Sequence, residues 1–285
     1  MATAVLGADR QAVTTAGRRF WKMTGSGNDF VFIDGRTESV AGLDEPAVVK
    51  RLCSRTLGIG ADGVVFLESA VGDQFRIRYY NRDGTRGELC GNASLCSSSL
   101  AVRLGLGQPE GFTFGTDVGR IAGRIVAGKP EIDLQPATGL RPDAQILLAA
   151  GERRIGFVDT GVPHLVVLVD DVGSVDVLAR GAELRRHPSL PAGANVNFVS
   201  PCGTAWRMRT FERGVEDETL ACGTGAAACA ILLQAWALQC GHVTTLVTSS
   251  ALELDVSTRP DTDGTIRPSL RGEGRLVFSG EVADL

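Results

Sequence analysis

The segment CGNASLCSSSLAVRL, residues 90–104, has a counterpart of the same design in CGTGAAACAILLQAWAL, residues 222–238. Each begins with a cysteine and a glycine and continues without proline into a run that we interpret as a helix. The second run is almost entirely Ala, Leu and Ile, so we expect that helix to be buried on nearly every side. The sequence therefore predicts two helices that each begin at a cysteine.

Those two cysteines, Cys90 and Cys222, stand where a thiol has unusual chemistry. At a helix N-terminus, unpaired backbone N–H groups and the positive end of the helix dipole favour a thiolate and can hold a carboxylate. Two such thiols could act on one carbon from opposite faces, one removing a proton and the other supplying one. This is the minimum equipment for inverting a stereocentre without a cofactor. We interpret four other cysteines as core residues in helical runs: Cys53, Cys96, Cys229 and Cys240.

Strand-like runs surround both helices, and each half of the chain repeats the same order of strands, glycine-bounded cysteine, long helix and further strands. We therefore predict an α+β fold of two similar domains, each with mostly antiparallel strands wrapped around a central helix. The predicted parts are a disordered leader at 1–17, an N-terminal domain at 18–135 plus 278–285, and a C-terminal domain at 136–277. Residues 135–143, with two prolines and a glycine, are the expected linker.

Composition narrows the class of protein. The 285 residues carry a net charge of −4, 44% are hydrophobic and 22% are charged, which is ordinary for a globular enzyme and gives no reason to expect nucleic acid or a membrane as partner. No apolar run reaches the ~20 residues of a membrane span, and we predict no signal peptide. Seven cysteines, an odd number, indicate reduced thiols in a cytoplasm. No metal site is predicted, because there is no Cys-x2-Cys pair and only three histidines are present.

Several polar residues accompany the cysteines. His164 lies in a turn before the predicted strand 165–169 and is the histidine best placed to deprotonate a thiol. Glu212 and Arg213 follow a predicted strand and precede Cys222, whereas we interpret the acidic run 216–218 as a solvated loop. The glycine loop 25–30 leads into a strand and lacks a P-loop lysine, so it does not predict a phosphate site. Amide donors suited to a substrate with carboxylate and ammonium groups are Asn28, Asn81, Asn92 and Asn195.

Together these segments resemble the diaminopimelate epimerase family of cofactor-independent amino-acid racemases. The resemblance follows family order from about residue 18 to the C-terminus. It is carried by Lys22 to Phe30, Gly58 to Gly63, Tyr80 to Gly84, Leu89 to Asn92, Gly161 to His164, Asn195 to Phe198, Glu212 to Gly214 and Ala221 to Gly225. Two cysteine motifs with several flanking blocks are far more specific than any single motif.

The resemblance implies an active site in the cleft between the domains and epimerisation of LL-2,6-diaminopimelate to the meso form, without a cofactor, in lysine and peptidoglycan biosynthesis. By family roles Cys90 and Cys222 are the acid–base pair, with His164 and Glu212 supporting them. Substrate binding is assigned to Asn28, Asn81, Asn195, Glu212 and Arg213, and to the backbone of Gly91, Asn92, Gly223 and Thr224. The expected protein is a cytoplasmic enzyme, possibly a homodimer, whose partner is its small-molecule substrate.

The sequence also departs from the family pattern. Val162 stands where the family commonly has an asparagine that contacts the distal end of the substrate, and Ala93 and Leu95 replace a glycine and an arginine. The loop 215–220 is one residue longer than the usual form. Val162 motivates an alternative, a racemase of this fold that acts on another amino acid. A thiol hydrolase using one Cys–His pair and a non-catalytic binding protein are further alternatives.

Overall fold

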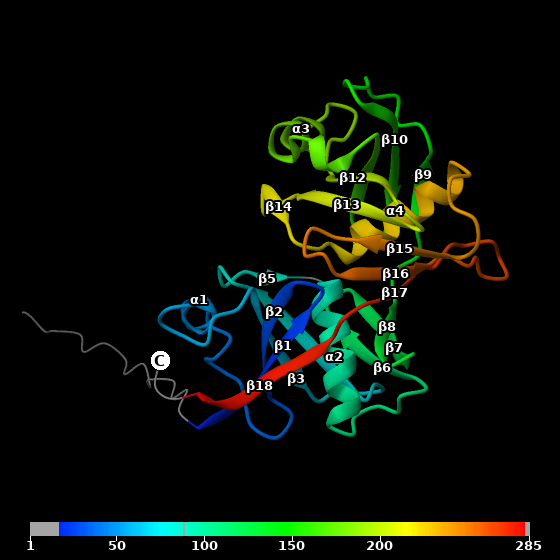
Figure 1. Ribbon diagram of the computed structural model, residues 1–285. Helices are drawn as coiled ribbons and strands as arrows, with labels where there is room; N and C mark the ends of the chain where they lie inside the picture. The colour runs from blue at the N-terminus through cyan, green and yellow to red at the C-terminus, as the bar shows by residue number, and fades with distance from the viewer. Residues whose placement is uncertain (1–16, 88, 283–285) are drawn as a thin grey trace, which may run out of the picture.

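The computed structural model describes residues 17–87 and 89–282, so the predicted leader lies, except for Gly17, outside the described residues. Two halves lie one above the other (Figure 1), and the predicted α+β class is confirmed. The first half contains helices α1 (Pro46–Cys53) and α2 (Gly91–Arg103). Its strands are β1 (Arg18–Gly25), β2 (Asn28–Asp34), β3 (Gly63–Glu68), β4 (Phe75–Asn81), β5 (Arg86–Gly87), β6 (Phe112–Thr116), β7 (Gly119–Val126) and β8 (Lys129–Asp133).

The second half contains the short 3-10 helix η1 (Val172–Ser174), α3 (Val177–Arg185) and α4 (Gly223–Ala235). Its strands are β9 (Thr138–Arg141), β10 (Glu152–Asp159), β11 (Pro163–Val169), β12 (Asn195–Cys202), β13 (Ala205–Glu212), β14 (Asp217–Thr219), β15 (Val243–Val247), β16 (Glu253–Ser257) and β17 (Ser269–Arg271). The last strand, β18 (Arg275–Val282), returns to the first half and pairs with β1. Most pairings are antiparallel, and the parallel ones are β2–β3, β4–β6, β11–β12 and β13–β15.

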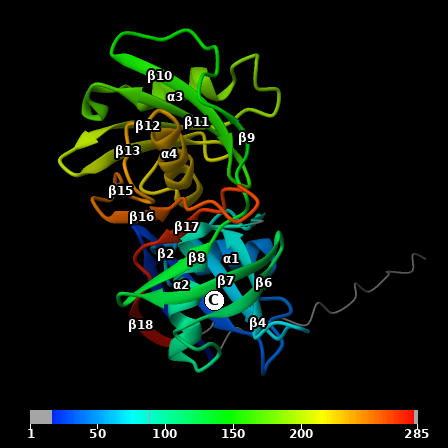
Figure 2. The same cartoon turned by 90° about the vertical axis from the view of Figure 1, so that its right-hand side faces the viewer.

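The halves are joined through the sheet as well as through the chain. β8 of the first half pairs antiparallel with β17 of the second, with Ile132 opposite Leu270. Figure 2 shows these two strands between the halves, with α4 above them and α2 below. The domain boundaries stay a prediction, and the pairing of β18 with β1 supports placing the chain end with the first half.

Each half is built around its long helix. Both α2 and α4 are buried along most of their length and share one apolar core with residues such as Phe30, Phe114 and Trp206. The expectation that the second helix is buried on nearly every side is confirmed, since residues 225–233 are all buried. Burial on all sides is what lets each helix hold its N-terminus rigidly toward the other half.

Some predicted elements need correction. The second helix ends at Ala235 rather than Leu238, because Ala237 takes a left-handed backbone conformation with φ of 57°. Cys240 therefore lies beyond the helix and is exposed, not in a core. The linker 135–143 contains β9, which pairs with β10. The acidic run 216–218 enters β14, where Glu218 forms an ion pair with Arg209 of β13.

Candidate active site

The N-termini of α2 and α4 meet head to head across the boundary between the halves. A Cβ atom built on Gly91 would lie 3.6 Å from the Cα of Gly223, and one built on Gly223 would lie 3.6 Å from the Cα of Gly91. Leu270 of β17 packs against both glycines. Two sets of unpaired helical N–H groups therefore converge on one region, which suits a bound carboxylate.

The two cysteines occupy equivalent places at these termini. Cys90 is the N-cap of α2 with φ and ψ of −130° and 116°, and Cys222 is the N-cap of α4 with −131° and 109°. The backbone N–H of Gly225 donates to the Cys222 Sγ at 3.4 Å. The N–H groups of Ala93 and Asn92 favour the Cys90 thiolate electrostatically, but the Cys90 side chain accepts no capping hydrogen bond. The predicted duplication of one device is thus confirmed in its backbone geometry.

The surroundings of both thiols raise their pKa values. Burial, with a contribution from the Glu212 carboxylate, raises the pKa of Cys90 to about 11, although the N–H groups of Ala93 and Asn92 oppose the rise. Burial and Glu212 likewise raise the pKa of Cys222 to about 12 against the Thr224 hydroxyl and the Gly225 N–H. A neighbouring base is therefore required to produce a thiolate near neutral pH.

Glu212, at the end of β13, is placed to influence both thiols, because its charge acts on Cys90 and on Cys222. Burial raises the pKa of Glu212, and the Thr219 hydroxyl partly opposes that rise. An ionised carboxylate whose pKa is raised is a stronger base than usual, so it is a suitable acceptor for a thiol proton. Glu212 is therefore coupled electrostatically to both thiols.

His164 is fully buried in β11 and not in the preceding turn. The Asn197 side chain is oriented by two hydrogen bonds: its Oδ1 accepts from the Thr210 hydroxyl, and its Nδ2 donates to the Leu165 carbonyl. The group that faces His164 Nδ1 at 3.0 Å is therefore Nδ2, which donates to it. Burial, with the charge of Arg213, lowers the pKa of His164 to about 3. The imidazole is therefore neutral and carries its proton on Nε2, which has no hydrogen-bond partner among the described residues.

Three asparagines of the first half belong to the predicted substrate-binding set. Asn28 at the start of β2 accepts a hydrogen bond through Oδ1 from the Asn92 amide at 2.7 Å. Asn81 at the end of β4 accepts from the Tyr79 hydroxyl at 2.8 Å. The buried Asn92 Oδ1 has no partner among the described residues. This one unmet acceptor suits the ammonium group of an amino acid.

The second half contributes another polar group. The backbone N–H of Arg213 donates to Asn195 Oδ1 at 2.8 Å, and the Arg213 guanidinium donates to the Ala192 carbonyl at 2.9 Å. The Thr160 hydroxyl donates to the carbonyl of Thr224 in the first turn of α4, at 3.0 Å. These contacts join Asn195 to Arg213 and tie the turn that contains Val162 to the second helix.

Sequence reasoning missed two residues that shape the site. Asn197 orients His164. A Cβ atom built on Gly225 would lie 2.3 Å from Asn197 Oδ1, so only glycine fits at position 225. Leu270 packs under both N-terminal glycines. Asn197 had a local signal, since it alternates with Asn195 on the same strand, whereas β17 is too short to be predicted.

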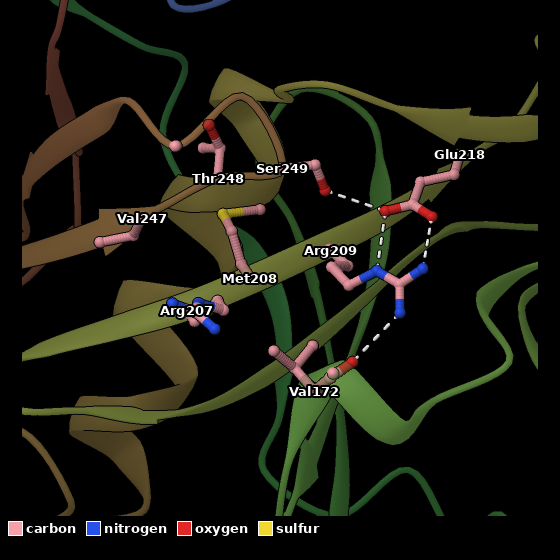
Figure 3. A pocket seen from close by; sticks show the side chains of 10 residues that line it. Val172, Arg207, Met208, Arg209, Glu218, Val247, Thr248 and Ser249 are labelled. Atoms are coloured by element: carbon pink, nitrogen blue, oxygen red, sulfur yellow. Dashed lines mark hydrogen bonds and ion pairs between the residues drawn. The ribbon is translucent and has the colours of Figure 1, made fainter.

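Two cavities lie away from the thiols. One of about 480 Å³ is lined by Arg207, Arg209, Glu218 and Ser249 among others, and Figure 3 shows that Glu218 is held by both Arg209 and Ser249. Another of about 450 Å³ lies beside Arg103, Lys129 and Glu273. Among the described residues no group of three or more His, Cys, Asp and Glu could hold a metal ion, and no helix is long and apolar enough to cross a membrane.

Comparison with known proteins agrees with this arrangement. The sequence model of the diaminopimelate epimerase family matches residues 20–135 and 156–264. A diaminopimelate epimerase of Gemmatimonas aurantiaca is 51% identical over 276 residues, covering 93% of this chain and 99% of that protein. A diaminopimelate epimerase of Aquifex aeolicus is 40% identical and covers 75% of this chain and 80% of that protein.

Solved structures share the fold at much lower identity. A Bacillus anthracis phenazine biosynthesis protein of the PhzF family superposes with a TM-score of 0.72 at 14% identity, covering 93% of this chain and 98% of that one. A hydroxyproline epimerase from Agrobacterium vitis superposes with a TM-score of 0.65 at 18% identity, covering 93% and 92%. These likenesses establish the two-domain α+β fold, while the sequence matches establish the family. The chain belongs to the diaminopimelate epimerase family of isomerases.

Proposed function

We propose that Cys90 and Cys222 form the acid–base pair with which this chain epimerises LL-2,6-diaminopimelate to the meso form. The observation that carries the proposal is the head-to-head placement of the two helix N-termini, with a cysteine at the cap of each. Family membership supports the substrate. Family membership does not favour a racemase that acts on another amino acid. The two remaining alternatives, a thiol hydrolase with one Cys–His pair and a non-catalytic binding protein, would have no use for two matched thiols.

In the proposed reaction the substrate carboxylate binds between the N–H groups of Gly91 and Asn92 on one side and those of Gly223 and Thr224 on the other. The thiolate of one cysteine removes the α-proton and becomes a thiol. The thiol of the other cysteine gives its proton to the opposite face of the carbon and becomes a thiolate. The fixed dipoles of both helices stabilise the negative charge that develops between these two steps.

Glu212 is the group we propose as acceptor of the proton that must leave one thiol before the reaction begins. Its raised pKa and its effect on both thiols support this role. His164 carries its proton on Nε2, so its proposed role is to donate from Nε2, with Asn197 holding the ring. This differs from the sequence-based expectation that His164 takes a proton from a thiol.

Recognition of the remaining substrate groups is proposed for Asn28, Asn81, Asn195 and Arg213, with the guanidinium binding the distal carboxylate. Arg213 already contacts the Ala192 carbonyl through one nitrogen and Asn195 through its backbone, so these contacts hold it at the edge of the site. A guanidinium is suited to a carboxylate because its N–H groups match the two oxygens.

The test is turnover. The purified chain is assayed with LL-diaminopimelate and with a panel of single amino acids under reducing conditions. We expect conversion of LL- to meso-diaminopimelate and loss of that activity in both Cys90→Ala and Cys222→Ala. Cys240→Ala, which removes an exposed thiol, is the matched control and keeps wild-type activity. Turnover of another amino acid without turnover of diaminopimelate would overturn the assignment of the substrate.

Two further proposals concern the cell and the assembly. The family's place in lysine biosynthesis and the free thiols of all seven cysteines support a cytoplasmic location. A homodimer is proposed as the assembly and is tested by sedimentation velocity of the purified chain.

A further inference from the structure

A continuous chain of hydrogen bonds runs from Asp62 to the first turn of α2. Asp62 precedes β3, and its Oδ2 accepts from the Asn28 amide nitrogen at 3.2 Å. Asn28 Oδ1 in turn accepts from the Asn92 amide nitrogen at 2.7 Å. Asn92 is the second residue of α2, two positions beyond Cys90. A carboxylate outside the cysteine motifs is therefore connected to the helix turn that supports a catalytic thiol.

This chain has a fixed direction because of its first member. An ionised carboxylate only accepts hydrogen bonds, so Asn28 must turn its NH2 group toward Asp62 and its oxygen toward Asn92. In the reversed orientation the Asn28 oxygen would face the Asp62 carboxylate, and the Asn28 NH2 group would face the Asn92 NH2 group. The orientation that Asp62 imposes on Asn28 therefore also fixes the orientation of the Asn92 amide. Asn92 Oδ1 is left as a buried acceptor with no partner among the described residues.

Asp62 is itself held firmly on the opposite side. Its Oδ1 accepts from the Arg55 guanidinium at 2.9 Å, and its backbone N–H donates to Asp29 Oδ1 at 3.1 Å. Asp29 pairs with the buried Lys22 at 2.7 Å and with Arg55 at 2.8 Å. Burial alone would raise the pKa of Asp29, but Arg55 and Lys22 outweigh it and bring the value to about 2. Two carboxylates and two cations therefore form an anchored group, which holds the Asp62 side chain in place.

We propose that Asp62 is a positioning residue for the reaction: it sets the amide orientation of Asn28, and through Asn28 that of Asn92, and so holds the first turn of α2 against Cys90. The inference rests on the proposed function for its effect on turnover. Its effect on the Cys90 thiol does not depend on the substrate and is measured separately.

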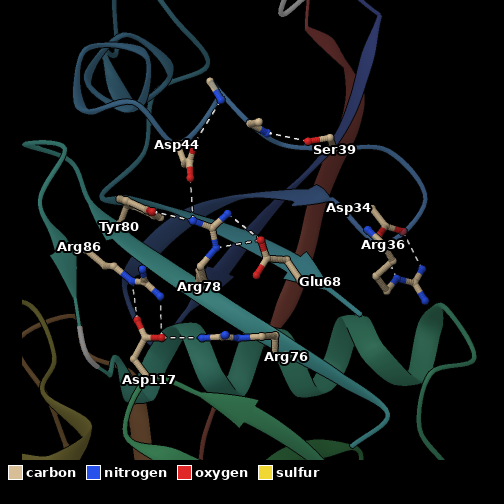
Figure 4. A network of polar contacts seen from close by, with 12 residues as sticks. Asp34, Arg36, Ser39, Asp44, Glu68, Arg76, Arg78, Tyr80, Arg86 and Asp117 are labelled. Atoms are coloured by element: carbon tan, nitrogen blue, oxygen red, sulfur yellow. Dashed lines mark hydrogen bonds and ion pairs between the residues drawn. The ribbon is translucent and has the colours of Figure 1, made fainter. Parts of the chain in front are cut away.

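The first measurement is steady-state kinetics with LL-diaminopimelate. Asp62→Ala removes the acceptor, and Asp62→Glu keeps the charge but moves the carboxylate by one methylene. Both are expected to lower kcat by about tenfold or more, because a small misplacement of a catalytic group is costly. Asp44→Ala is the matched control. Asp44 pairs with Arg78 (Figure 4), and its side chain is 28% exposed against 27% for Asp62. We expect it to keep kcat within about twofold, since a partly exposed ion pair contributes little.

A double variant separates positioning from general loosening. If Asp62 acts through Asn92, then in an Asn92→Ala background the change Asp62→Ala causes little further loss of kcat. Circular dichroism and thermal unfolding identify any variant that fails to fold, and Asp62→Glu then provides the comparison. The proposal would be overturned if Asp62→Ala lowered kcat by the same factor in the wild-type and Asn92→Ala backgrounds, or if Asp44→Ala lowered kcat as much as Asp62→Ala does.

The second measurement needs no substrate. The rate at which iodoacetamide alkylates Cys90 is followed against pH by peptide mass spectrometry, with Cys222 as internal reference. Glu212 and Asp62 both disfavour the Cys90 thiolate, while the N–H groups of Ala93 and Asn92 favour it. Loss of the charge alone would move the Cys90 profile to lower pH in Asp62→Ala. Displacement of the Asn92 turn would move it to higher pH by roughly half a unit.

We expect the shift to higher pH at Cys90 in Asp62→Ala and Asp62→Glu, with the Cys222 profile unchanged. A shift to lower pH, or equal shifts at both cysteines, contradicts the positioning role. The alkylation result stands even if diaminopimelate is not turned over, so a failure of the proposed function and a failure of this inference are distinguishable.

Discussion

Gly91 and Gly223 face each other so closely that a Cβ atom on either would contact the Cα of the other at 3.6 Å. Each glycine is the first residue of a buried helix, and each follows a cysteine. The contact fixes how far apart the two thiol-bearing turns stand. Because neither glycine has a side chain, both helix N-termini can approach this closely, and their N–H groups converge on one region.

The first prediction concerns this contact. In Gly223→Ala the new methyl would lie 2.6 Å from Leu270 Cδ2, whereas in Gly91→Ala it would lie 3.3 Å away. Overpacking of a closed core costs about 1–3 kcal/mol. We expect Gly223→Ala to lower the free energy of unfolding by that amount and to lose most activity, with a smaller effect for Gly91→Ala. Denaturant unfolding and turnover measure both.

Leu270→Val provides the control for that prediction, because it removes the Cδ2 atom that the new methyl would meet. Combined with Gly223→Ala, it should cause less destabilisation than the sum of the two single changes. Strict additivity would show that Leu270 does not limit the space at Gly223.

The second prediction concerns Glu212. Its charge raises the pKa of both Cys90 and Cys222, so Glu212→Gln should lower both values and speed alkylation of both thiols at pH 8 by roughly threefold to tenfold. Turnover should nevertheless fall, because the proton acceptor has been removed. Asp217→Asn, an exposed change on the neighbouring strand β14, is the control and should alter neither quantity. Faster turnover in Glu212→Gln would exclude it as the acceptor.

The third prediction concerns acid stability. The pKa of His164 is about 3 in the folded protein and about 6.5 in an unfolded chain. Between these values the unfolded chain binds the extra proton, so the folded state loses stability as the pH falls from about 6.5 toward 3. His164→Gln should weaken this dependence, measured as the difference in unfolding free energy between pH 7 and pH 4. His187→Gln, at a half-buried histidine outside the site, is the matched control for the removal of an imidazole.

The fourth prediction concerns the distal end of the substrate. Val162 lies half-buried in the turn before β11, and its carbonyl accepts from the Thr160 backbone N–H. Its side chain can form no hydrogen bond, whereas the resemblance to the family places an asparagine there. We expect Val162→Asn to lower KM for LL-diaminopimelate by roughly twofold to tenfold with kcat unchanged, the effect of one added hydrogen bond. An unchanged or higher KM would show that this turn does not reach the substrate.

Much of the architecture could be predicted from sequence because it depends on local patterns. The capped cysteines, the apolar run of α4 and the alternating residues of β4 each carry their own signal. What was missed depends on distant partners. β17 and β14 have three residues each and exist because β8, β13 and β16 pair with them. α3 has no strong apolar periodicity and is defined by packing against β12 and β13.

The site shows the same division. The cysteines were identified because each begins its own helix. The state of His164 could not be predicted, because it depends on Asn197 from another strand, which receives a hydrogen bond from Thr210 on a third. Likewise Glu212 precedes only Cys222 closely in sequence, whereas its charge acts on the Cys90 thiol as well because the two halves meet.

The central claim is that two cysteines on opposite faces of one carbon share the reaction. Its most direct test is incorporation of solvent deuterium at the α-carbon, followed by NMR from LL- and from meso-diaminopimelate in the wild type, Cys90→Ala and Cys222→Ala. We predict deuterium uptake with inversion in the wild type, and no inversion in either variant from either direction. Inversion with solvent deuterium in a variant that lacks one cysteine would contradict the two-thiol account.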